Sequence, residues 1–207
     1  HHLYKEKSKQ GKILNILKEC EKAGNEDMVY QFCSTSKITF PGAGVAAISS
    51  SENNIKDIKS RLTFQTIGHD KVNQLRHVKY FKNIQGLKKH MEKHADLLRP
   101  KFDATLNILQ KELGKLKVGT WSHPLGGYFI SFNAMNGCAK NIVKLCKEAG
   151  VTLTGAGAAF PYKKDPNDSN IRLAPSLPPV KEIKMAMTLF TKCVKLASVQ
   201  KLLSDGY

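Results

Sequence analysis

The segment Ser34-Thr35-Ser36-Lys37-Ile38-Thr39-Phe40-Pro41-Gly42-Ala43-Gly44 lies between two short apolar runs, at residues 28–33 and 45–48. Apolar runs of this length, bounded by turn residues, are typical of buried strands. The loop between them carries Lys37 among hydroxyl groups and glycines. It therefore offers donors for a phosphate and an amine for an aldehyde. A lysine in a polar loop is more often simply solvated, so these residues alone leave both interpretations open.

Helical patterns flank the two predicted strands. Apolar residues recur with a helical period over residues 11–23, and this pattern closes at Gly24. Ser51 and Glu52 form a helix start, and we expect that second helix to run to about Leu62. Because helix and strand alternate here, the region is predicted to be part of an α/β layer.

The pattern changes beyond Gly68. Residues 70–80 are predicted to form one helix, and residues 85–113 a long amphipathic helix that is broken or kinked near Pro100. A strand at 127–132, a helix at 137–149, a short strand near Val151, a strand at 171–173 and a helix at 179–203 should follow. This order predicts a small α+β domain after a boundary near residue 84.

Composition limits the classes of protein that the chain can belong to. It has 207 residues, of which 41% are hydrophobic and 24% charged, as expected for a globular protein. No apolar run approaches the roughly 18 residues of a membrane span. The cysteines are odd in number and form no CxxC pair, so a reducing cytoplasm fits best; they are Cys20, Cys33, Cys138, Cys146 and Cys193.

The formal net charge of +16 could indicate a nucleic-acid partner. Most of the excess is lysine placed singly along helical segments, without the arginines and aromatic residues that read bases or stack on single strands. We therefore expect solvated helix faces and no nucleic acid, with a basic nucleic-acid-binding module as the alternative.

The lysine loop resembles the S-x-S-K signature of fold type I pyridoxal phosphate enzymes, the aspartate aminotransferase superfamily, and is most similar to its MocR-like branch. The resemblance implies that Lys37 forms the Schiff base with pyridoxal 5'-phosphate and moves the proton during catalysis. It also implies that Ser34 and Ser36 are hydroxyl groups on the phosphate side of the cofactor. Many members have an arginine seven or eight residues after the lysine, where this chain has Gly44 and Val45. Thr39 is the candidate to contribute in its place.

Two motifs downstream occur in the family's order. Asn170-Ile171-Arg172-Leu173-Ala174-Pro175-Ser176 resembles the segment whose arginine binds the substrate α-carboxylate, a task suited to the planar guanidinium fork. Pro124-Leu125-Gly126-Gly127-Tyr128-Phe129 resembles the P-x-G-G-x-F strand near the substrate entrance. Arg172 and Gly127 are therefore predicted to bind substrate, although a surface arginine and an ordinary glycine turn are the alternatives.

Weaker candidates lie on the helices. Arg76, or Lys71, is predicted to meet a substrate side-chain carboxylate, with a helix-surface role as the alternative. His90 and His94 have the spacing of metal ligands, but no third ligand is evident and we expect no metal site.

The resemblance implies that the chain is the C-terminal portion of an aminotransferase, because only 36 residues precede Lys37. Residues 1–84 would end the large pyridoxal-phosphate-binding domain, and residues 85–207 would form the small domain. The enzyme is expected to be a cytoplasmic homodimer that transfers an amino group from aspartate or glutamate to a 2-oxo acid. The chain should be poorly active without the missing N-terminal part. A related pyridoxal-phosphate lyase or regulator domain is the other alternative.

Overall fold

A computed structural model describes residues 2–4 and 6–206. The chain divides into two compact units, which are described separately below. Unit 1 comprises residues 1–2 and 10–94, and unit 2 comprises residues 3–9 and 95–207. No helix in the described part of the chain is long and apolar enough to span a membrane.

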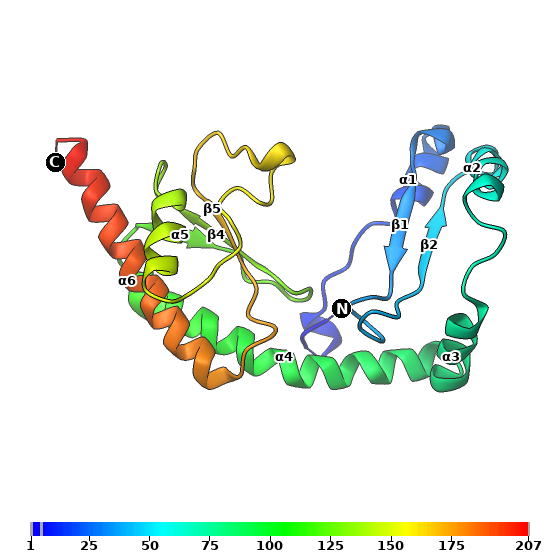
Figure 1. The fold of residues 1–207 in the computed structure, drawn as a ribbon, viewed down its shortest axis with the longest axis horizontal. Helices are drawn as coiled ribbons and strands as arrows, with labels where there is room; N and C mark the ends of the chain where they lie inside the picture. The colour runs from blue at the N-terminus through cyan, green and yellow to red at the C-terminus, as the bar shows by residue number, and fades with distance from the viewer. Residues whose placement is uncertain (1, 5, 207) are drawn as a thin grey trace. The chain divides into compact units, whose positions relative to one another are not determined.

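Unit 1 is built around an antiparallel strand pair (Figure 1). Strand β1 pairs with β2 in a register that sets Phe32 opposite Ile48 and Ser34 opposite Ala46. The elements of this unit are α1 Ile16–Lys22, the 3₁₀ turn Glu26–Met28, β1 Gln31–Ser34, β2 Ala46–Ser49, α2 Glu52–Gln65, α3 Lys71–Phe81 and the start of α4 Ile84–Leu113. Both predicted strands are therefore present, displaced by one to three residues.

The prediction that the strand at residues 28–33 is buried is wrong for the described chain. Every residue of β1 is exposed, with Phe32 at 73%, and only Ile48 of β2 is half-buried. The β1–β2 pair has no further strand beside it among the described residues. An apolar run reveals that a strand forms, but it does not reveal what covers the strand.

The helices of unit 1 start where polar side chains cap them. Helix α1 starts at Ile16, later than predicted, because the Asn15 side chain accepts a bond from the amide of Lys18 (3.4 Å). The Ser51 hydroxyl accepts from the amide of Asn54 (3.2 Å) and begins α2. Asp70 caps α3 in the same way, through the amide of Asn73 (2.8 Å).

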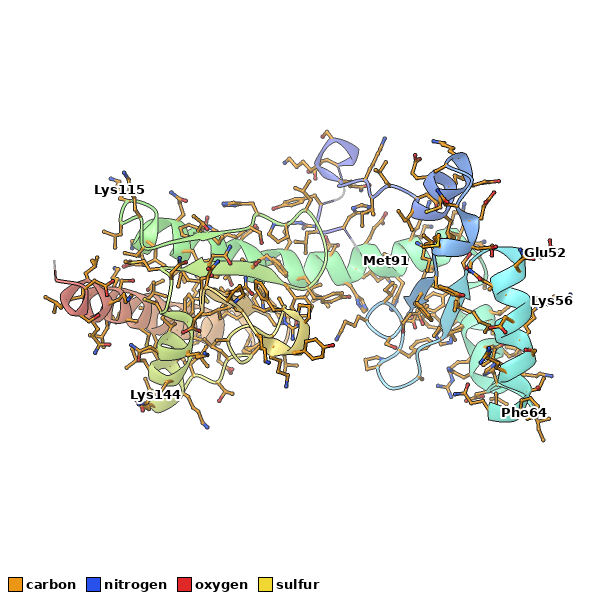
Figure 2. The ribbon with its side chains drawn as sticks, turned by 90° about the horizontal axis from the view of Figure 1, so that it is seen from above. Glu52, Lys56, Phe64, Met91, Lys115 and Lys144 are labelled. Carbon is orange, nitrogen blue, oxygen red and sulfur yellow. The ribbon has the colours of Figure 1, made fainter. Side chains whose placement is uncertain are left out.

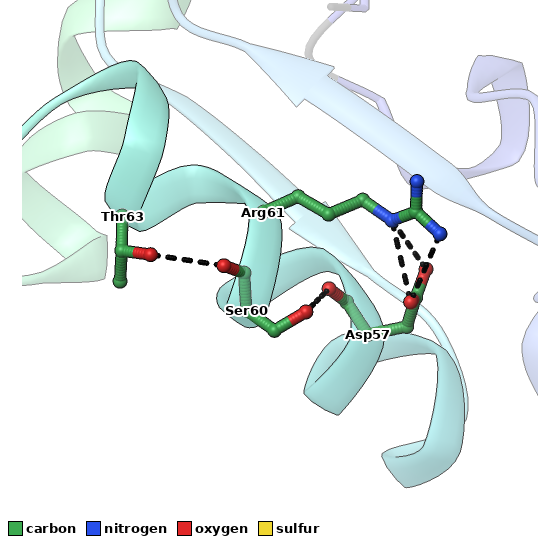
Figure 3. Close-up of polar contacts among 4 residues, drawn as sticks. All are labelled: Asp57, Ser60, Arg61 and Thr63. Atoms are coloured by element: carbon green, nitrogen blue, oxygen red, sulfur yellow. Dashed lines mark hydrogen bonds and ion pairs between the residues drawn. The ribbon is translucent and has the colours of Figure 1, made fainter.

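Helix α2 is further supported by contacts along its own surface (Figure 3). Arg61 Nε lies 3.1 Å from a carboxylate oxygen of Asp57, one turn earlier. The hydroxyl of Ser60 donates to the backbone oxygen of Asp57 (2.7 Å), and that of Thr63 donates to the oxygen of Ser60 (2.9 Å). The ion pair is exposed and screened by solvent, so it stabilises the helix only slightly. Phe64, near the end of this helix, is 94% exposed (Figure 2).

Helix α4 is continuous from Ile84 to Leu113, so it is not broken near Pro100, and the alternative of a kink there stays a prediction. Proline removes one helical hydrogen bond, yet tertiary packing can outweigh that loss. Leu98 and Phe102, on either side of Pro100, are both buried in the core of unit 2 and hold the flanking turns in place.

Unit 2 is a three-stranded antiparallel sheet of order β3-β4-β5 with α5 and α6 packed beside it (Figure 1). Its remaining elements are the 3₁₀ turns Lys7–Lys9 and Pro161–Lys163, β3 Gly119–Trp121, β4 Ile130–Ala134, β5 Asn170–Leu173, α5 Ala139–Glu148 and α6 Val180–Ser204. The predicted strand at 171–173 and the two predicted helices are confirmed. Strand β3 was not predicted.

Two strand predictions in unit 2 need correction. The strand predicted from residue 127 starts at Ile130, because Gly127 adopts a positive φ of 85° that a strand does not use. Val151 is not in a strand. Its amide donates to the oxygen of Cys146 (2.8 Å) and so closes the end of α5, while its side chain packs against the core.

The core of unit 2 alternates strictly along β4, where Ile130, Phe132 and Ala134 face inward. Phe132 is fully buried and meets Phe190 of α6 edge to face, with ring centroids 5.1 Å apart. Each such side chain stabilises the unit by about 1.5–3 kcal/mol through burial.

Candidate functional site

Lys37 lies in a single helical turn directly after β1. The backbone oxygen of Thr35 accepts from the amides of Ile38 (2.8 Å) and Thr39 (2.9 Å), which closes the turn. Lys37 is exposed between these fixed residues. We call residues 34–44 the lysine loop.

The base of the lysine loop is tied to the first residue after it. The amide of Thr35 donates to the oxygen of Val45 (2.8 Å), and the amide of Val45 donates to the hydroxyl oxygen of Thr35 (2.8 Å). A Cβ atom on Gly44 would lie 2.7 Å from the Cα atom and 2.8 Å from the nitrogen of Ser36, and would also clash with the Ser36 hydroxyl. Gly44 therefore has to be glycine for the two arms of the loop to pass this closely.

Ser34 and Ser36 bring their hydroxyl groups together. The two Oγ atoms are 2.7 Å apart, and the amide of Ser36 donates to Ser34 Oγ (3.2 Å). Both residues are exposed, so both hydroxyls can also reach a ligand. A pair of hydroxyl groups beside closely packed backbone is a suitable donor set for an anion such as phosphate.

Thr39 has a different environment from the two serines. It is only 4% exposed, and its hydroxyl lies within hydrogen-bond distance of Thr35 Oγ1 (3.0 Å) and of His77 Nε2 (2.8 Å). These contacts occupy its hydroxyl inside the protein. The contribution of Thr39 to phosphate binding stays a prediction, because its hydroxyl contacts Thr35 and His77 inside the protein.

A second cluster lies in unit 2, where the other two motifs meet. The Arg172 guanidinium carbon lies 4.5 Å from the centroid of the Phe129 ring, in a cation–π contact. Arg172 faces Ser131 in the β4–β5 ladder, and Gly127 makes the turn that leads into β4. The Nε atom of Arg172 is buried and has no hydrogen-bond partner among the described residues. The structure thus brings the predicted Arg172 and Gly127 segments together, and the contact is made by Phe129 at the end of the glycine motif.

The start of β5 is organised by residues that the sequence did not suggest. The Asp165 carboxylate accepts from the amides of Asn167 (3.0 Å), Ser169 (2.8 Å) and Asn170 (2.7 Å). These bonds, led by that from Asn170, hold the pKa of Asp165 below its usual range. Asn170 is buried, and its side-chain Nδ2 donates to Ser131 Oγ (2.9 Å) and Asn133 Oδ1 (2.8 Å) on β4. The contacts of Asn170, two residues before Arg172, therefore fix the register of β5 against β4.

The remaining candidates are on helices of unit 1. Arg76 and Lys71 are exposed on α3, and a contact with substrate stays a prediction. The rings of His90 and His94 contact each other at an interplanar angle of 51°, with centroids 4.5 Å apart. Partial burial and the neighbouring His90 lower the pKa of His94. No cluster of three metal-ligating side chains occurs among the described residues.

Comparison with known proteins identifies the family of the chain. Residues 1–205 match the family model described as aspartate amino-transferase. The chain belongs to the aspartate aminotransferase family. A curated aspartate aminotransferase of Corynebacterium glutamicum is 44% identical over 188 residues, which is 91% of this chain and 44% of that protein. The chain therefore spans about half the length of the curated relatives it matches.

Solved structures of aminotransferases agree with this assignment. The crystal structure of an aspartate transaminase from Corynebacterium glutamicum superposes with a TM-score of 0.91 at 43% identity, covering 97% of this chain and 47% of that one. LysN, an α-aminoadipate aminotransferase from Thermus thermophilus, shares the fold with a TM-score of 0.76 at 18% identity, covering 96% of this chain and 48% of its own. The predicted family and the predicted fold, a C-terminal portion of the fold type I transferases, are both confirmed.

Membership of the aspartate aminotransferase family implies pyridoxal phosphate, and LysN was solved with N-(5'-phosphopyridoxyl)-L-leucine. The lysine loop fits this group chemically. It presents a primary amine, two adjacent hydroxyls and a close backbone approach at Gly44 that a Cβ atom would fill.

Proposed function

We propose that this chain is the part of an aminotransferase that carries the cofactor-binding lysine, Lys37, and the carboxylate-binding arginine, Arg172. The observation that supports this most directly is the lysine loop, where Lys37 is exposed on a turn that is bonded at both ends. Residues 1–84 would then belong to the large domain and residues 85–207 to the small domain.

Pyridoxal phosphate supplies an aldehyde that can bond to an amine and a conjugated ring that accepts electrons. In our proposal, Lys37 holds the cofactor through its amine and then, once released, moves a proton at the substrate α-carbon. Ser34 and Ser36 donate their hydroxyl hydrogens to the phosphate. Thr39 acts from inside the protein, by supporting the turn that carries Lys37.

Arg172 would bind the α-carboxylate of the amino acid or the 2-oxo acid. Phe129 covers one face of its guanidinium, which leaves the planar edge available for two parallel hydrogen bonds. Aspartate is the substrate we propose, because a curated relative and a solved structure that are both more than 40% identical to this chain are named aspartate aminotransferase and aspartate transaminase. Arg76 is proposed to meet its side-chain carboxylate.

Other parts of the proposal concern the assembly. An N-terminal part of the same enzyme would complete the large domain, two copies would form a homodimer, and the enzyme would work in the cytoplasm. A pyridoxal-phosphate lyase would use Lys37 and Arg172 in the same way and would differ in its product. Assay of both 2-oxo acid and amino acid products separates these two reactions.

Covalent trapping tests the role of Lys37. The chain is mixed with pyridoxal phosphate, so that an amine condenses with the aldehyde and releases water, and the product is reduced with borohydride and mapped by peptide mass. We expect Lys37 to be labelled well above other exposed lysines, such as Lys56 on α2 and Lys115 in the turn after α4 (Figure 2). Equal or greater labelling of those lysines would overturn the assignment.

A chimera tests the activity itself. This chain replaces its matched segment in the Corynebacterium glutamicum aspartate transaminase, which has the same backbone over that segment at a TM-score of 0.91. We expect transamination of aspartate, lost by at least about a thousandfold in Lys37→Ala, because the essential amine is absent. A chimera that transaminates equally well with Lys37→Ala would contradict the proposal.

A further inference from the structure

We propose that His77 is a positioning residue for Lys37, which it holds through the buried hydroxyl of Thr39. The two residues are 38 positions apart in sequence, and their contact joins α3 to the lysine loop. This inference rests on the role proposed above for Lys37, but it makes a structural claim that can be tested separately.

The hydrogen bonds of His77 fix which of its ring nitrogens carries the proton. His77 Nδ1 lies 2.9 Å from the backbone oxygen of Asn73, one turn earlier on α3. A carbonyl oxygen can only accept, so Nδ1 is the donor and Nε2 of the neutral ring is an acceptor. The Thr39 hydroxyl lies 3.2 Å from Thr35 O, 3.0 Å from Thr35 Oγ1 and 2.8 Å from His77 Nε2. We assign its single hydrogen to the shortest of these contacts, the one with Nε2.

A second contact from the same face of α3 holds the far end of the lysine loop. The Asn73 side-chain amide donates to the backbone oxygen of Ala43 (2.9 Å). Asn73 and His77 are four residues apart, so they lie one above the other on one helix face. Together they fix the loop on both sides of the Phe40-Pro41-Gly42 tip.

Ring packing orients His77 in addition to its hydrogen bonds. The Phe40 ring, from the loop tip, meets His77 edge to face at 5.1 Å and stacks on Phe81 at 5.6 Å. Among the described residues of unit 1, Thr39 and Phe81 are the buried ones. Both lie where α3 packs against the lysine loop. The best-packed part of unit 1 is therefore the joint between α3 and the lysine loop.

The consequence for Lys37 follows from the turn. Lys37 lies midway between Thr35, which is bonded to Val45, and Thr39, which is bonded to His77. Loss of the Thr39 contact frees one end of the turn and lets the lysine amine occupy a larger volume. A group displaced by about 1 Å from its reactive geometry can lose on the order of a hundredfold in rate.

Two substitutions remove the contact with little change in shape. Thr39→Val replaces the hydroxyl by a methyl group, and His77→Phe keeps a ring beside Phe40. Thr105→Val is the matched control, because Thr105 is also buried but its hydroxyl donates to Lys101 within α4 (2.9 Å). Tyr80→Phe controls for the ring cluster, since Tyr80 also packs on Phe40 (5.3 Å).

Amide hydrogen exchange on the full chain is the first measurement. We expect Thr39→Val and His77→Phe each to speed exchange at Ile38, Thr39 and Val45 about fivefold to tenfold, as for one lost hydrogen bond. The double variant should add almost nothing to Thr39→Val, because His77→Phe removes only a contact that Thr39→Val has already lost, together with the contacts between Thr39 and Thr35. The two control variants should leave these amides unchanged.

The second measurement is the rate of borohydride-trapped labelling of Lys37 by pyridoxal phosphate. We expect this rate to fall by a similar factor in both variants and to recover partly in His77→Gln, whose amide oxygen can accept from Thr39. Unchanged exchange at Ile38 and Thr39, or additive effects in the double variant, would overturn the role of His77. If the wild-type chain is labelled elsewhere while exchange responds as expected, the proposed role of Lys37 fails and the contact between His77 and the loop stands.

Discussion

The two units exclude water from their apolar side chains to very different extents. In unit 2, Ile130 and Phe132 on β4 are completely buried between the sheet and its helices. In unit 1, Phe32 on β1 is 73% exposed, although its strand is as regular as β4. Burial of apolar side chains supplies most of the favourable free energy of folding. A strand whose side chains are exposed is therefore expected to depend on contacts with another part of the protein for its stability.

This difference indicates how the two units depend on the rest of the enzyme. Unit 2 has its own core and satisfies the requirement for independent folding. Unit 1 has exposed apolar side chains on both strands and several helices, and the relatives of this chain are about twice as long. We expect the proposed N-terminal part of the enzyme to cover β1 and β2.

Cysteine reactivity should show the largest contrast between the units. Cys33 on β1 is exposed, whereas burial and the neighbouring Cys193 raise the pKa of Cys146 to about 12. At pH 8 only about one Cys146 in ten thousand is then a thiolate, the form that reacts. With an aromatic disulfide reagent, Cys33 should react within minutes and Cys146 only after unfolding. Fast labelling of Cys146 in the native chain would show that unit 2 opens readily.

Truncating a phenylalanine to alanine should lower the free energy of unfolding by several kcal/mol more in unit 2 than in unit 1. Phe132→Ala removes a fully buried ring and should lower the free energy of unfolding of unit 2 by about 3–5 kcal/mol. Phe32→Ala removes an exposed ring and should change stability by less than about 0.5 kcal/mol. The loss in unit 2 is measured by urea unfolding followed by the fluorescence of Trp121, which stacks on Phe132 with ring centroids 6.2 Å apart. The effect of Phe32→Ala is measured by urea unfolding followed by circular dichroism. Similar losses for both variants would contradict the comparison.

Gly44→Ala should disturb the one part of unit 1 that is tightly packed. The new Cβ atom would meet the Ser36 backbone, and relieving such overlap costs about 1–3 kcal/mol. We expect faster amide exchange at Val45 and slower labelling of Lys37 by pyridoxal phosphate. Gly11→Ala is the control, because a Cβ atom there meets nothing within 4 Å. Equal behaviour of the two variants would show that the loop adapts freely.

The smallest expected effect is a pH dependence confined to unit 2. Because backbone amides lower the pKa of Asp165 in the folded chain, its contribution to stability is complete above the unfolded value of about 3.9. It is lost as the pH falls through the lower folded value. Asp165→Asn should therefore destabilise unit 2 at pH 6 and flatten its acid unfolding below pH 4. Trp121 fluorescence measures the stability of unit 2 at pH 6 by urea unfolding and its acid unfolding below pH 4 by titration. Asp103→Asn on α4 is the control.

Local sequence signals predicted most helices and both strands around Lys37. The capping residues Ser51 and Asp70 mark helix starts directly, and the family motifs led to Arg172 and Gly127. Burial could not be predicted in the same way, because an apolar run such as that around Phe32 looks the same whether or not another layer covers it. Strand β3 has three residues, too few to show a period.

Contacts between distant segments were beyond any local signal. Nothing near Thr39 in the sequence suggests His77, and nothing near Arg172 suggests Phe129, because each pair is formed by the packing of separate elements. The Asp165 turn was missed for another reason. Its partners are backbone amides, which every residue except proline possesses and which therefore leave no mark on the sequence.

The Asp165 turn also affects how freely the enzyme can diversify. One carboxylate gathers the amides that begin β5, so the position of Arg172 in the ladder is set from residue 165 onward. The 3₁₀ turn Pro161–Lys163, with left-handed backbone at Tyr162 and Lys163, lies upstream of this anchor. Insertions and deletions there would alter the rim of unit 2 while β5 keeps its register. The length of the loop before Asp165 is thus independent of the place at which Arg172 enters the ladder.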